Sequence, residues 1–412
     1  MKPASSANLS SEITLKARRE RLSGQFNVSF LLRTIVAATL IGVLGIAFSS
    51  SDGGRQLGFA WLLNVWFGLS ICLGAIFFVA IQHITRSGWS VTVRRVAELI
   101  GASVVGPVVL LLPVIIGLLS GHKEIFSWND PVYVAGDAIL EGKEAYLNAP
   151  FFSVRALIYS AVWIVAGVWL LRTSRRQDRS ADRLLTLKME RRSAPILILL
   201  GLTITFASFD WLMSLDPHWF STIYGVYVFS GAMTAALAVL AIVAAVWVNS
   251  ERHRELVTPE HLHDITKLLY GFNCFWAYIA FSQYLLIWYA NIPEETIWLK
   301  HRQTHGWDFV TLILMTGHFF VPFVLLMPRA AKRNPVIVIG VACLLLVMHW
   351  LDLYWLIYPQ FNESPVLGLT EMIGLMLVIS FTALIAVRLG RGENLVPVSD
   401  PRLPEALKHH VT

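Results

Sequence analysis

The sequence predicts an all-α protein that crosses a membrane with about ten helices. Three observations support this fold class. The 412 residues are 56% hydrophobic with a mean hydropathy of +0.61, and only 15% are charged, whereas soluble domains carry roughly 25%. About ten apolar runs each reach the roughly 20 residues that a span requires. Basic residues recur in every second loop, as they do when alternate loops face the cytoplasm.

The apolar runs follow one another along the whole chain. In order, the predicted spans are 29–49, 57–85, 96–119, 152–172, 194–214, 222–248, 265–290, 307–328, 334–358 and 366–389. Each is predicted to be helical, because an isolated segment in lipid must satisfy its own backbone hydrogen bonds. Residues 29–390 thus form one membrane domain, between a polar, basic segment at 1–28 and a tail at 391–412. Prolines interrupt the tail, and we expect it to be extended.

Loop charge predicts the orientation of these spans. The most basic loop lies between spans four and five, with Arg172, Arg175, Arg176, Arg179, Arg183, Arg191 and Arg192. Loop 121–150, on the other side, holds five acidic residues against two lysines, and we predict a short surface helix near 137–147. Both termini are predicted to be cytoplasmic, because positive loops stay on that side. Run 29–49 is longer than the apolar core of a cleaved signal peptide, so we expect a span there.

Composition and motifs exclude several function classes. The basic loops account for the formal net charge of +6, so we expect no nucleic-acid partner. Cys72, Cys274 and Cys343 lie far apart inside apolar runs without CxxC spacing, which argues against an encoded iron–sulfur cluster, c-type haem or disulfide framework. The chain has no P-loop, no GxGxxG motif and no HExxH motif. We therefore predict neither nucleotide binding nor a metal site.

One stretch, 208–230, gathers acidic, basic and aromatic residues at the edge of a predicted span. Asp210 lies within the outer third of span five. Asp216 and His218 flank Pro217, which cannot donate to a preceding helical turn. We interpret these two residues as part of an outer turn that joins spans five and six, and both are also candidates for the outer end of a proton path. Asp210 alone lies inside the membrane, where an ionisable side chain needs a partner or a cavity.

Further ionisable residues lie at graded depths, judged from the helical rise of ~1.5 Å per residue. His318 and His349 fall near the middles of spans eight and nine, and Asp352 shares a face with His349 because they are three residues apart. Glu371 falls in the outer third of span ten. Together with Asp210, we interpret these residues as a proton path; the alternative is that each makes a paired contact between helices. A haem b between the two histidines is disfavoured, because a tryptophan follows His349.

Two ionisable residues lie near the cytoplasmic ends of predicted spans. His83 is near the end of span two, and Glu98 near the start of span three. Both are candidates for the cytoplasmic part of a proton path. Glu98 stands beside Arg94 and Arg95, so its simplest interpretation is a surface ion pair.

Several long motifs resemble one family. FDWLMSLDPHWFSTIYGVYVFSGA (209–232), FWAYIAFSQYLLIWYANIPEETIW (275–298), VMHWLDLYWL (347–356) and PVSDPRL (397–403) look like the smaller of the two large membrane subunits of alternative complex III. This ActF-type subunit belongs to a bacterial quinol:cytochrome c oxidoreductase. AYLNAPFFSVRALIYSAVW (145–163) resembles a segment found more widely in the NrfD or polysulfide reductase membrane-subunit superfamily.

The resemblance implies ten helices, with spans two to five and six to nine forming two four-helix bundles and two further helices at the periphery. It implies a bacterial inner-membrane location. The partners would be a larger NrfD-like membrane subunit, a periplasmic iron–sulfur subunit and c-type cytochrome subunits, with cytochrome c or a terminal oxidase accepting the electrons. The redox centres would lie in those partners, and this chain would bind no cofactor unless it binds quinone. The matching residues are Asp210, Asp216, His218, His349 and Asp352, and more weakly His318 and Glu371.

Three functions from different classes remain open. The first is a structural, proton-conducting subunit of a respiratory oxidoreductase, without its own redox centre. The second is a quinone-binding subunit that itself hosts quinol oxidation. The third is a secondary transporter, for which broken helices in matched halves are expected; the one candidate break, at Pro217, lies at the surface.

Overall fold

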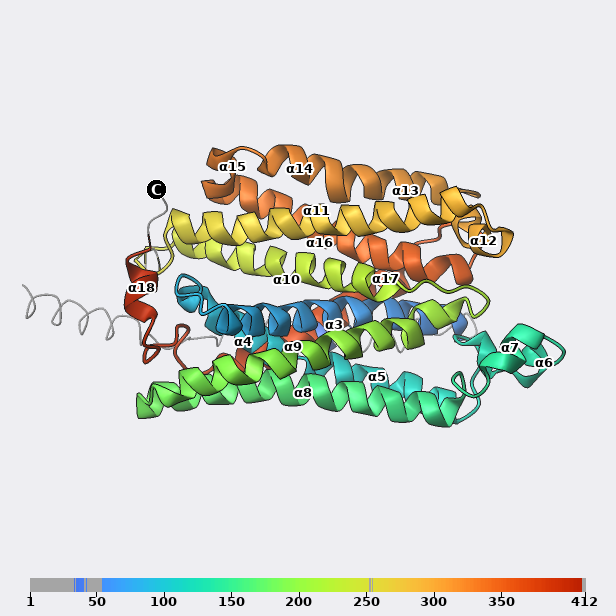
Figure 1. The fold of residues 1–412 in the computed structure, drawn as a ribbon, viewed down its shortest axis with the longest axis horizontal. Coiled ribbons are helices and arrows are strands. Elements are labelled where there is room, and N and C mark those ends of the chain that lie inside the picture. The colour runs from blue at the N-terminus through green and yellow to red at the C-terminus, as the bar shows by residue number, and fades with distance from the viewer. Residues whose placement is uncertain are drawn as a thin grey trace, which may run out of the picture.

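The computed structural model describes residues 33, 35–40, 42, 54–251, 253 and 255–409. Within these residues the secondary structure is helical, without a β-strand, and the long helices lie side by side along one axis (Figure 1). Predicted span 29–49 falls outside the described residues apart from 33, 35–40 and 42. The all-α class is therefore confirmed for the described part of the chain.

Eight helices of the described part are long and apolar enough to cross a membrane. Four are single α-helices: α3 (Arg55–Ile84), α8 (Ala149–Ser180), α10 (Tyr224–Val248) and α17 (Leu369–Gly390). Two join a pair of elements near their ends or middle: Val91–Leu119 comprises α4 (Val91–Ala102) and α5 (Val105–Leu119), and Leu184–Leu215 comprises α9 (Leu184–Trp211) and η2 (Met213–Leu215). The last two are Trp307–Leu326, which comprises α13 (Trp307–Leu314), η3 (Met315–Phe320) and α14 (Val321–Leu326), and Pro335–Gln360, which comprises α16 (Pro335–Ile357) and η4 (Tyr358–Gln360). Each coincides with a predicted span, as expected for a multi-pass membrane protein.

One further long helix, α11 (Pro259–Ala290), covers predicted span 265–290 and runs beside α10 (Figure 1). It has 32 residues but is not among the eight apolar helices. Its Asn273 and Gln283, both buried, contribute to its lower hydropathy. The total of about ten spans and their division into two four-helix bundles therefore stay predictions.

Short helices occupy the ends of the molecule. They are η1 (Ser127–Asn129), α6 (Pro131–Val134), α7 (Ala138–Lys143), α12 (Pro293–His301), α15 (Arg329–Arg333) and α18 (Leu403–Leu407). The side chain of Asp137 accepts hydrogen bonds from the backbone of Ile139 and Leu140 and so caps α7. The surface helix that the sequence predicted in this loop is thereby confirmed.

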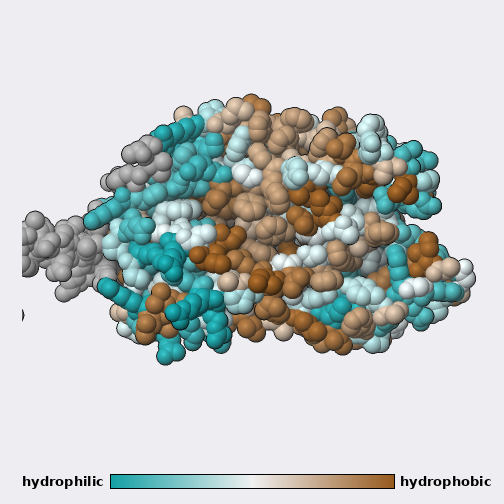
Figure 2. Space-filling model, viewed as in Figure 1, coloured by the Kyte–Doolittle hydropathy of each residue, from teal (hydrophilic) through white to brown (hydrophobic). Residues whose placement is uncertain are grey.

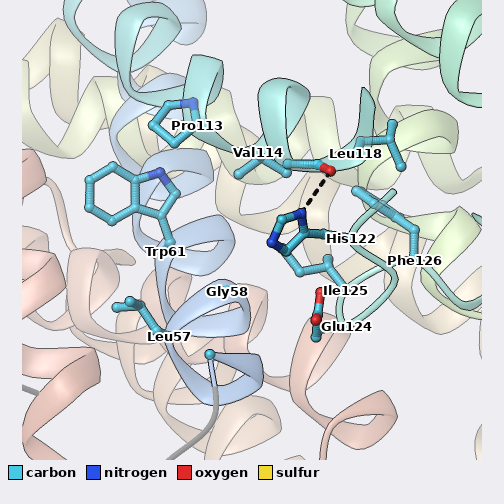
Figure 3. Close-up of a pocket in the computed structure, with 12 residues that line it drawn as sticks. Leu57, Gly58, Trp61, Pro113, Val114, Leu118, His122, Glu124, Ile125 and Phe126 are labelled. Carbon is cyan, nitrogen blue, oxygen red and sulfur yellow. Dashed lines mark hydrogen bonds between the residues drawn. The ribbon is translucent and has the colours of Figure 1, made fainter. Parts of the chain in front are cut away.

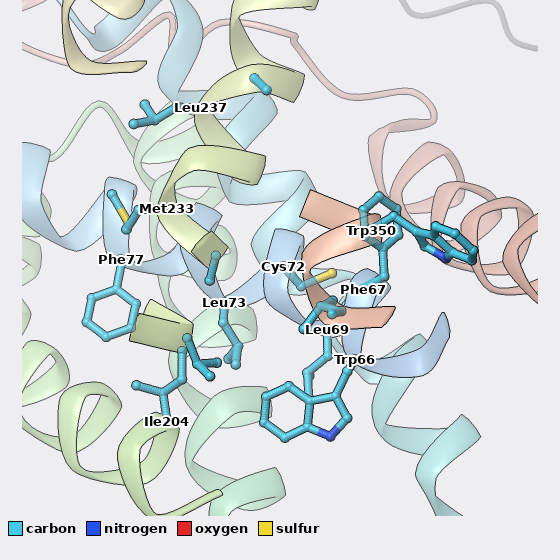
Figure 4. Packing of buried hydrophobic residues seen from close by; sticks show 14 of the residues in the cluster. Trp66, Phe67, Leu69, Cys72, Leu73, Phe77, Ile204, Met233, Leu237 and Trp350 are labelled. Carbon is cyan, nitrogen blue, oxygen red and sulfur yellow. The ribbon is translucent and has the colours of Figure 1, made fainter. Parts of the chain in front are cut away.

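The centre of the fold is the contact between α3 and α10. α3 packs against α4, α5, α9, α16 and α17 as well, and α10 against α9, α11 and α16. At Gly74 a Cβ atom would stand 2.2 Å from the carbonyl oxygen of Ala232, so only glycine lets the two backbones approach. Figure 4 shows the apolar side chains around this contact, among them Phe77 of α3, Met233 of α10 and Ile204 of α9. Polar groups inside such a core require hydrogen-bond partners.

The two ends of the helix array are polar, and hydrophobic side chains gather between them (Figure 2). We call one end the basic end; it comprises the described residues 85–90, 181–183, 249–251, 253, 255–258 and 391–409. The opposite, loop end comprises 120–148, 212–223, 291–306 and 358–368. The tail is not extended as predicted: it folds back across the basic end, and its α18 packs against α4. Its charged side chains find buried partners there, which sequence pattern alone does not reveal.

Candidate functional site

A buried polar cluster lies between η3 and α16. His318 comes from η3, and His349 and Asp352 come from α16. One nitrogen or oxygen of each residue lies within 4.8 Å of the others, and all three side chains are at most 2% exposed. The structure thus brings together three of the residues that the sequence proposed for a proton path.

The carboxylate of Asp352 is held by donors from two other helices. Tyr227 of α10 donates its hydroxyl hydrogen to Oδ1, and Nε1 of Trp276 of α11 donates to Oδ2 at 3.1 Å. Both oxygens are therefore partnered, which offsets the penalty of burying a carboxyl group in an apolar core. The sequence by itself singled out neither Tyr227 nor Trp276 as a partner of Asp352.

The hydrogen-bond network indicates which nitrogen of His349 is free. Ser70 Oγ donates to the carbonyl of Phe67 at 2.8 Å, and its oxygen lies 2.8 Å from His349 Nε2. The serine hydrogen is thus used, so Nε2–H of the histidine is the donor in this pair. Nδ1 then carries the lone pair, and it has no partner among the described residues.

His318 shows the same pattern. Its Nδ1 lies 3.2 Å from Oδ1 of Asn273, an acceptor, so Nδ1 carries the hydrogen. Its Nε2 has no partner within the described chain. Trp276 stacks on the imidazole with ring centroids 3.7 Å apart, which fixes the ring plane. The cluster therefore contains two unpartnered basic nitrogens beside a carboxylate.

Backbone features position both histidines. His318 lies in a π-helical turn, Met315–Phe320; such turns are rare and occur often at functional sites. His349 lies against Gly231 of α10, where a Cβ atom would stand 2.9 Å from the imidazole Cε1. The glycine therefore gives the ring room to approach α10.

Histidine and carboxylate ligands within 4.8 Å of one another are also the donor set of some metal sites. Here both oxygens of Asp352 already accept hydrogen bonds, from Tyr227 and Trp276. Each carboxylate oxygen keeps a second lone pair, and metal-ligating carboxylates commonly accept such hydrogen bonds. The two free histidine nitrogens can accept a proton or a water molecule with no change in this hydrogen-bond network.

Asp210 lies outside this cluster. Its carboxylate accepts two hydrogen bonds from Arg155, at 2.8 and 2.9 Å, and one from Tyr159 at 2.9 Å. These donors all come from α8, so the predicted link from Asp210 to His349 and Asp352 is not made by its hydrogen bonds. Arg155 was missed, although an arginine inside a predicted span signals a buried partner.

Asp216 and His218, the outer-turn residues of 208–230, make hydrogen bonds to other segments at the loop end. Asp216 accepts a hydrogen bond from Gln360 at 3.0 Å. His218 lies 2.6 Å from a carboxylate oxygen of Asp137, and this hydrogen bond holds the pKa of Asp137 below its ordinary value. Lys143 donates to the carbonyl of Pro217 at 2.5 Å. The interpretation of this segment as a connecting turn agrees with these contacts.

Glu371 caps a helix. Its Oε2 accepts from the backbone N–H of Gly368 at 2.8 Å, at the start of α17. Its Oε1 accepts from the hydroxyl of Tyr358 at 2.6 Å and from Gln56 at 3.1 Å. These donors belong to α3, η4 and the residue before α17, so Glu371 joins segments near the loop end rather than the histidine cluster.

An arginine that the sequence did not single out is buried at the loop end. Arg302 is 1% exposed and donates to the carbonyls of Trp298, Trp355 and Leu356 at 2.9–3.2 Å. Burial lowers its pKa to about 10, so it stays positively charged near neutral pH. It interacts electrostatically with Tyr224, Tyr227 and Asp216, and Tyr227 is itself a donor to Asp352 of the cluster.

At the basic end, Glu98 is buried rather than on the surface. It is 1% exposed and pairs with Arg94 at 3.4 Å and with Arg95 at 3.0 Å. The prediction of a surface ion pair was wrong, because α8 and the tail cover this part of α4: Arg95 also pairs with Asp178 of α8 at 2.7 Å. His83 is fully buried, and neither ring nitrogen has a partner among the described residues.

A cavity of 310 Å³ opens between α3 and α5 near the loop end (Figure 3). Its lining is mostly apolar and includes Trp61 and Phe126. The polar members are His122, which contacts the carbonyl of Gly117 at 3.2 Å, and Glu124. None of the proton-path candidates lines this cavity.

In comparisons with known proteins, no protein-family model and no curated protein matches the chain.

Proposed function

We propose that the chain is an integral membrane subunit of a bacterial respiratory quinol:cytochrome c oxidoreductase of the alternative complex III type, and that its polar core conducts protons. The observation that carries this proposal is the cluster of His318, His349 and Asp352, whose ligand atoms lie within 4.8 Å of one another. Each histidine keeps one ring nitrogen without a partner in the described chain. The cluster lies deep inside a helix array long enough to span a membrane.

The resemblance supports the same assignment. Three of the resembling motifs contribute to this cluster: Tyr227 lies in 209–232, Trp276 in 275–298, and His349 and Asp352 in 347–356. These segments are far apart in sequence and meet at one carboxylate. We take this convergence as support for a shared function of the motifs.

The chemistry proposed for the cluster is proton transfer. Nδ1 of His349 and Nε2 of His318 can each accept a proton, and the carboxylate of Asp352 stabilises the imidazolium that results. Ser70 and Asn273 hold the opposite ring nitrogens, so each ring presents its free nitrogen in a defined direction. Electrons need not enter this chain, since the redox centres belong to the partners.

In the proposed assembly the chain lies in the bacterial inner membrane with both termini cytoplasmic, so the basic end faces the cytoplasm. Its partners are a larger NrfD-like membrane subunit, a periplasmic iron–sulfur subunit and c-type cytochrome subunits, with a terminal oxidase as a further candidate. Its helices form the two four-helix bundles and the peripheral helices of that family.

Two measurements test this proposal. A tag on this chain should co-purify a subunit with iron–sulfur clusters and cytochrome subunits with c-type haem spectra. In proteoliposomes of that complex, Asp352→Asn should lower the number of protons moved per quinol oxidised. Glu363→Gln, which changes an exposed carboxylate, is the matched control. Isolation without redox partners would overturn the complex assignment, and unchanged proton movement in Asp352→Asn would overturn the proton role.

The quinone-binding alternative has one observation in its favour. The cavity beside Trp61 has 310 Å³ and a mostly apolar lining, within the range of roughly 300–1,000 Å³ for small-molecule sites. If a quinone binds there, it should quench tryptophan fluorescence, and Trp61→Leu should abolish part of that quenching. Quenching that is insensitive to this substitution would exclude the cavity as the site.

The transporter alternative has less support from the structure. Away from their ends, the described spans are irregular at the α4–α5 junction at 103–104 and at the π-turn η3. Neither is an unwound segment, because helix or turn conformation continues through both. Discontinuous helices of transporters instead expose unpaired backbone to a binding site.

A further inference from the structure

Two histidines and one aspartate bring metal-ligand atoms together inside the helix array. One nitrogen of His318, one nitrogen of His349 and one carboxylate oxygen of Asp352 lie within 4.8 Å of one another, and all three residues are buried. Within the part of the chain that the structure describes, no other group of three or more histidine, cysteine, aspartate or glutamate side chains comes this close. Zinc bonds of about 2.0–2.2 Å put the ligands of a tetrahedral site roughly 3.4 Å apart, so the three atoms draw closer when an ion binds.

Each histidine keeps the lone pair that a metal ion needs. Nδ1 of His349 and Nε2 of His318 are buried and have no partner among the described residues. The opposite nitrogens are already used, because Ser70 Oγ lies 2.8 Å from Nε2 of His349 and Asn273 Oδ1 lies 3.2 Å from Nδ1 of His318. Metal-ligating histidines show this arrangement, in which the second ring N–H donates to an oxygen. A buried imidazole nitrogen without a partner calls for a bound species.

The carboxylate of Asp352 is oriented in the same way. Tyr227 and Trp276 donate one hydrogen bond to each of its oxygens, and each oxygen keeps a second lone pair for an ion. Donors of this kind orient ligating carboxylates. Gly231 leaves room beside the pair, since a Cβ atom there would stand 3.0 Å from Nδ1 of His349 and 3.9 Å from Oδ2 of Asp352. The free nitrogen and this oxygen therefore border the same space.

The kind of ligand atom selects the metal. Magnesium and calcium prefer oxygen ligands throughout, whereas imidazole nitrogen suits zinc and other first-row metals. No cysteine belongs to the cluster, so its donor set does not match a copper(I) or iron–sulfur site. Three protein ligands leave the fourth position of zinc to a water molecule. Zinc and the Asp352 carboxylate together carry one net positive charge, and hydroxide in that fourth position would cancel it within the apolar core.

We propose that His318, His349 and Asp352 form a binding site for one zinc ion, with Nε2, Nδ1 and a carboxylate oxygen as the respective ligands. Zinc and protons compete for the same two nitrogens, so a zinc-loaded chain is closed to proton transfer through this cluster. That consequence rests on the proposed function, whereas the metal site itself does not. Because the three ligands are buried, we expect the ion to enter while the chain folds and to exchange slowly.

Metal analysis tests the site directly. The full-length chain, with the subunits that accompany it, is purified through a tag without histidine from cells grown with or without added zinc. With added zinc, the wild type should contain about one more zinc ion per chain than Asp352→Asn or His349→Gln, each of which removes one of three ligands. Its zinc X-ray absorption spectrum, less that of Asp352→Asn, should show nitrogen and oxygen at about 2.0–2.2 Å and no sulfur. His305→Gln, which changes an exposed histidine, is the matched control and should keep the ion.

Melting separates loss of the ion from loss of the fold. Zinc should raise the melting temperature of the wild type and leave that of Asp352→Asn unchanged, because an ion stabilises only the state that binds it. Equal zinc contents in the wild type and both ligand variants would overturn the site. Zinc binding that leaves proton movement unaltered would support the site and overturn the proton role of the cluster. A complex without zinc in this chain, whose proton movement falls in Asp352→Asn, would overturn the site and support the proposed function.

Discussion

Tyr227 on α10 donates its hydroxyl hydrogen to the carboxylate of Asp352 on α16. Both side chains are buried, and the bond joins two central helices at the same point where His318 and His349 meet. The polar cluster therefore has a structural consequence besides its proposed chemistry: it holds α10, α11 and α16 in register, because Trp276 of α11 donates to the other oxygen.

Tyr227→Phe should destabilise the protein by about 1–3 kcal/mol, because it leaves one oxygen of buried Asp352 without its donor. Unfolding of the detergent-solubilised protein measures this effect. Tyr289→Phe is the control, since Tyr289 is 83% exposed. A Tyr227→Phe protein that unfolds like the wild type would show that this hydrogen bond contributes nothing to holding α10 and α16 together.

Gly231→Ala should cost about 1–3 kcal/mol of stability, because its Cβ would stand 2.9 Å from His349 Cε1 and one of the two must move. The control is Gly271→Ala on α11, where nothing lies within 4 Å. Helix propensity alone should make that control neutral or slightly stabilising. Equal stability of the two variants would contradict the close approach of His349 to α10.

Arg155→Met should destabilise by about 3–5 kcal/mol, because it leaves the buried carboxylate of Asp210 without its bidentate partner. The double variant Arg155→Met/Asp210→Leu should recover much of the loss, since no unpaired charge remains. Proton movement in the double variant should match the wild type, because neither residue contacts the histidine cluster. A large proton defect in the double variant would return Asp210 to the proton path.

The contact between His218 and Asp137 predicts a pH dependence at the loop end. The folded pKa of Asp137 is lowered, chiefly by the hydrogen bond from His218. Its contribution to stability is therefore full above the unfolded pKa of about 3.9 and is lost as pH falls through the lower folded value. Pepsin cleavage within 121–148 should accelerate as pH is lowered through that range. His218→Gln should shift the acceleration to higher pH; an unshifted profile would contradict the assignment.

Local pattern was enough to place most of the helices. Eight predicted spans coincide with long apolar helices, because the length of an apolar run directly reflects the thickness that a helix must cross. The pairing of His349 with Asp352 followed from their spacing of three residues, which puts them on one face of any helix. The short helix predicted near 137–147 is also local, since the structure shows that Asp137 caps it.

Packing between helices decided which side chains contact one another. No periodicity within one helix tells which neighbour meets it, so the sequence joined Asp210 to His349, whereas the fold joins Asp210 to Arg155. For the same reason the sequence missed Ser70, Asn273 and Tyr227, each a single polar residue in an apolar run. The tail is the clearest case, because its composition is that of an exposed segment. Only the tertiary structure shows that Asp400 of the tail forms a buried ion pair with Arg94 of α4. By itself the sequence determined where the long apolar helices lie; which side chains meet between them depended on contacts between residues far apart in the chain.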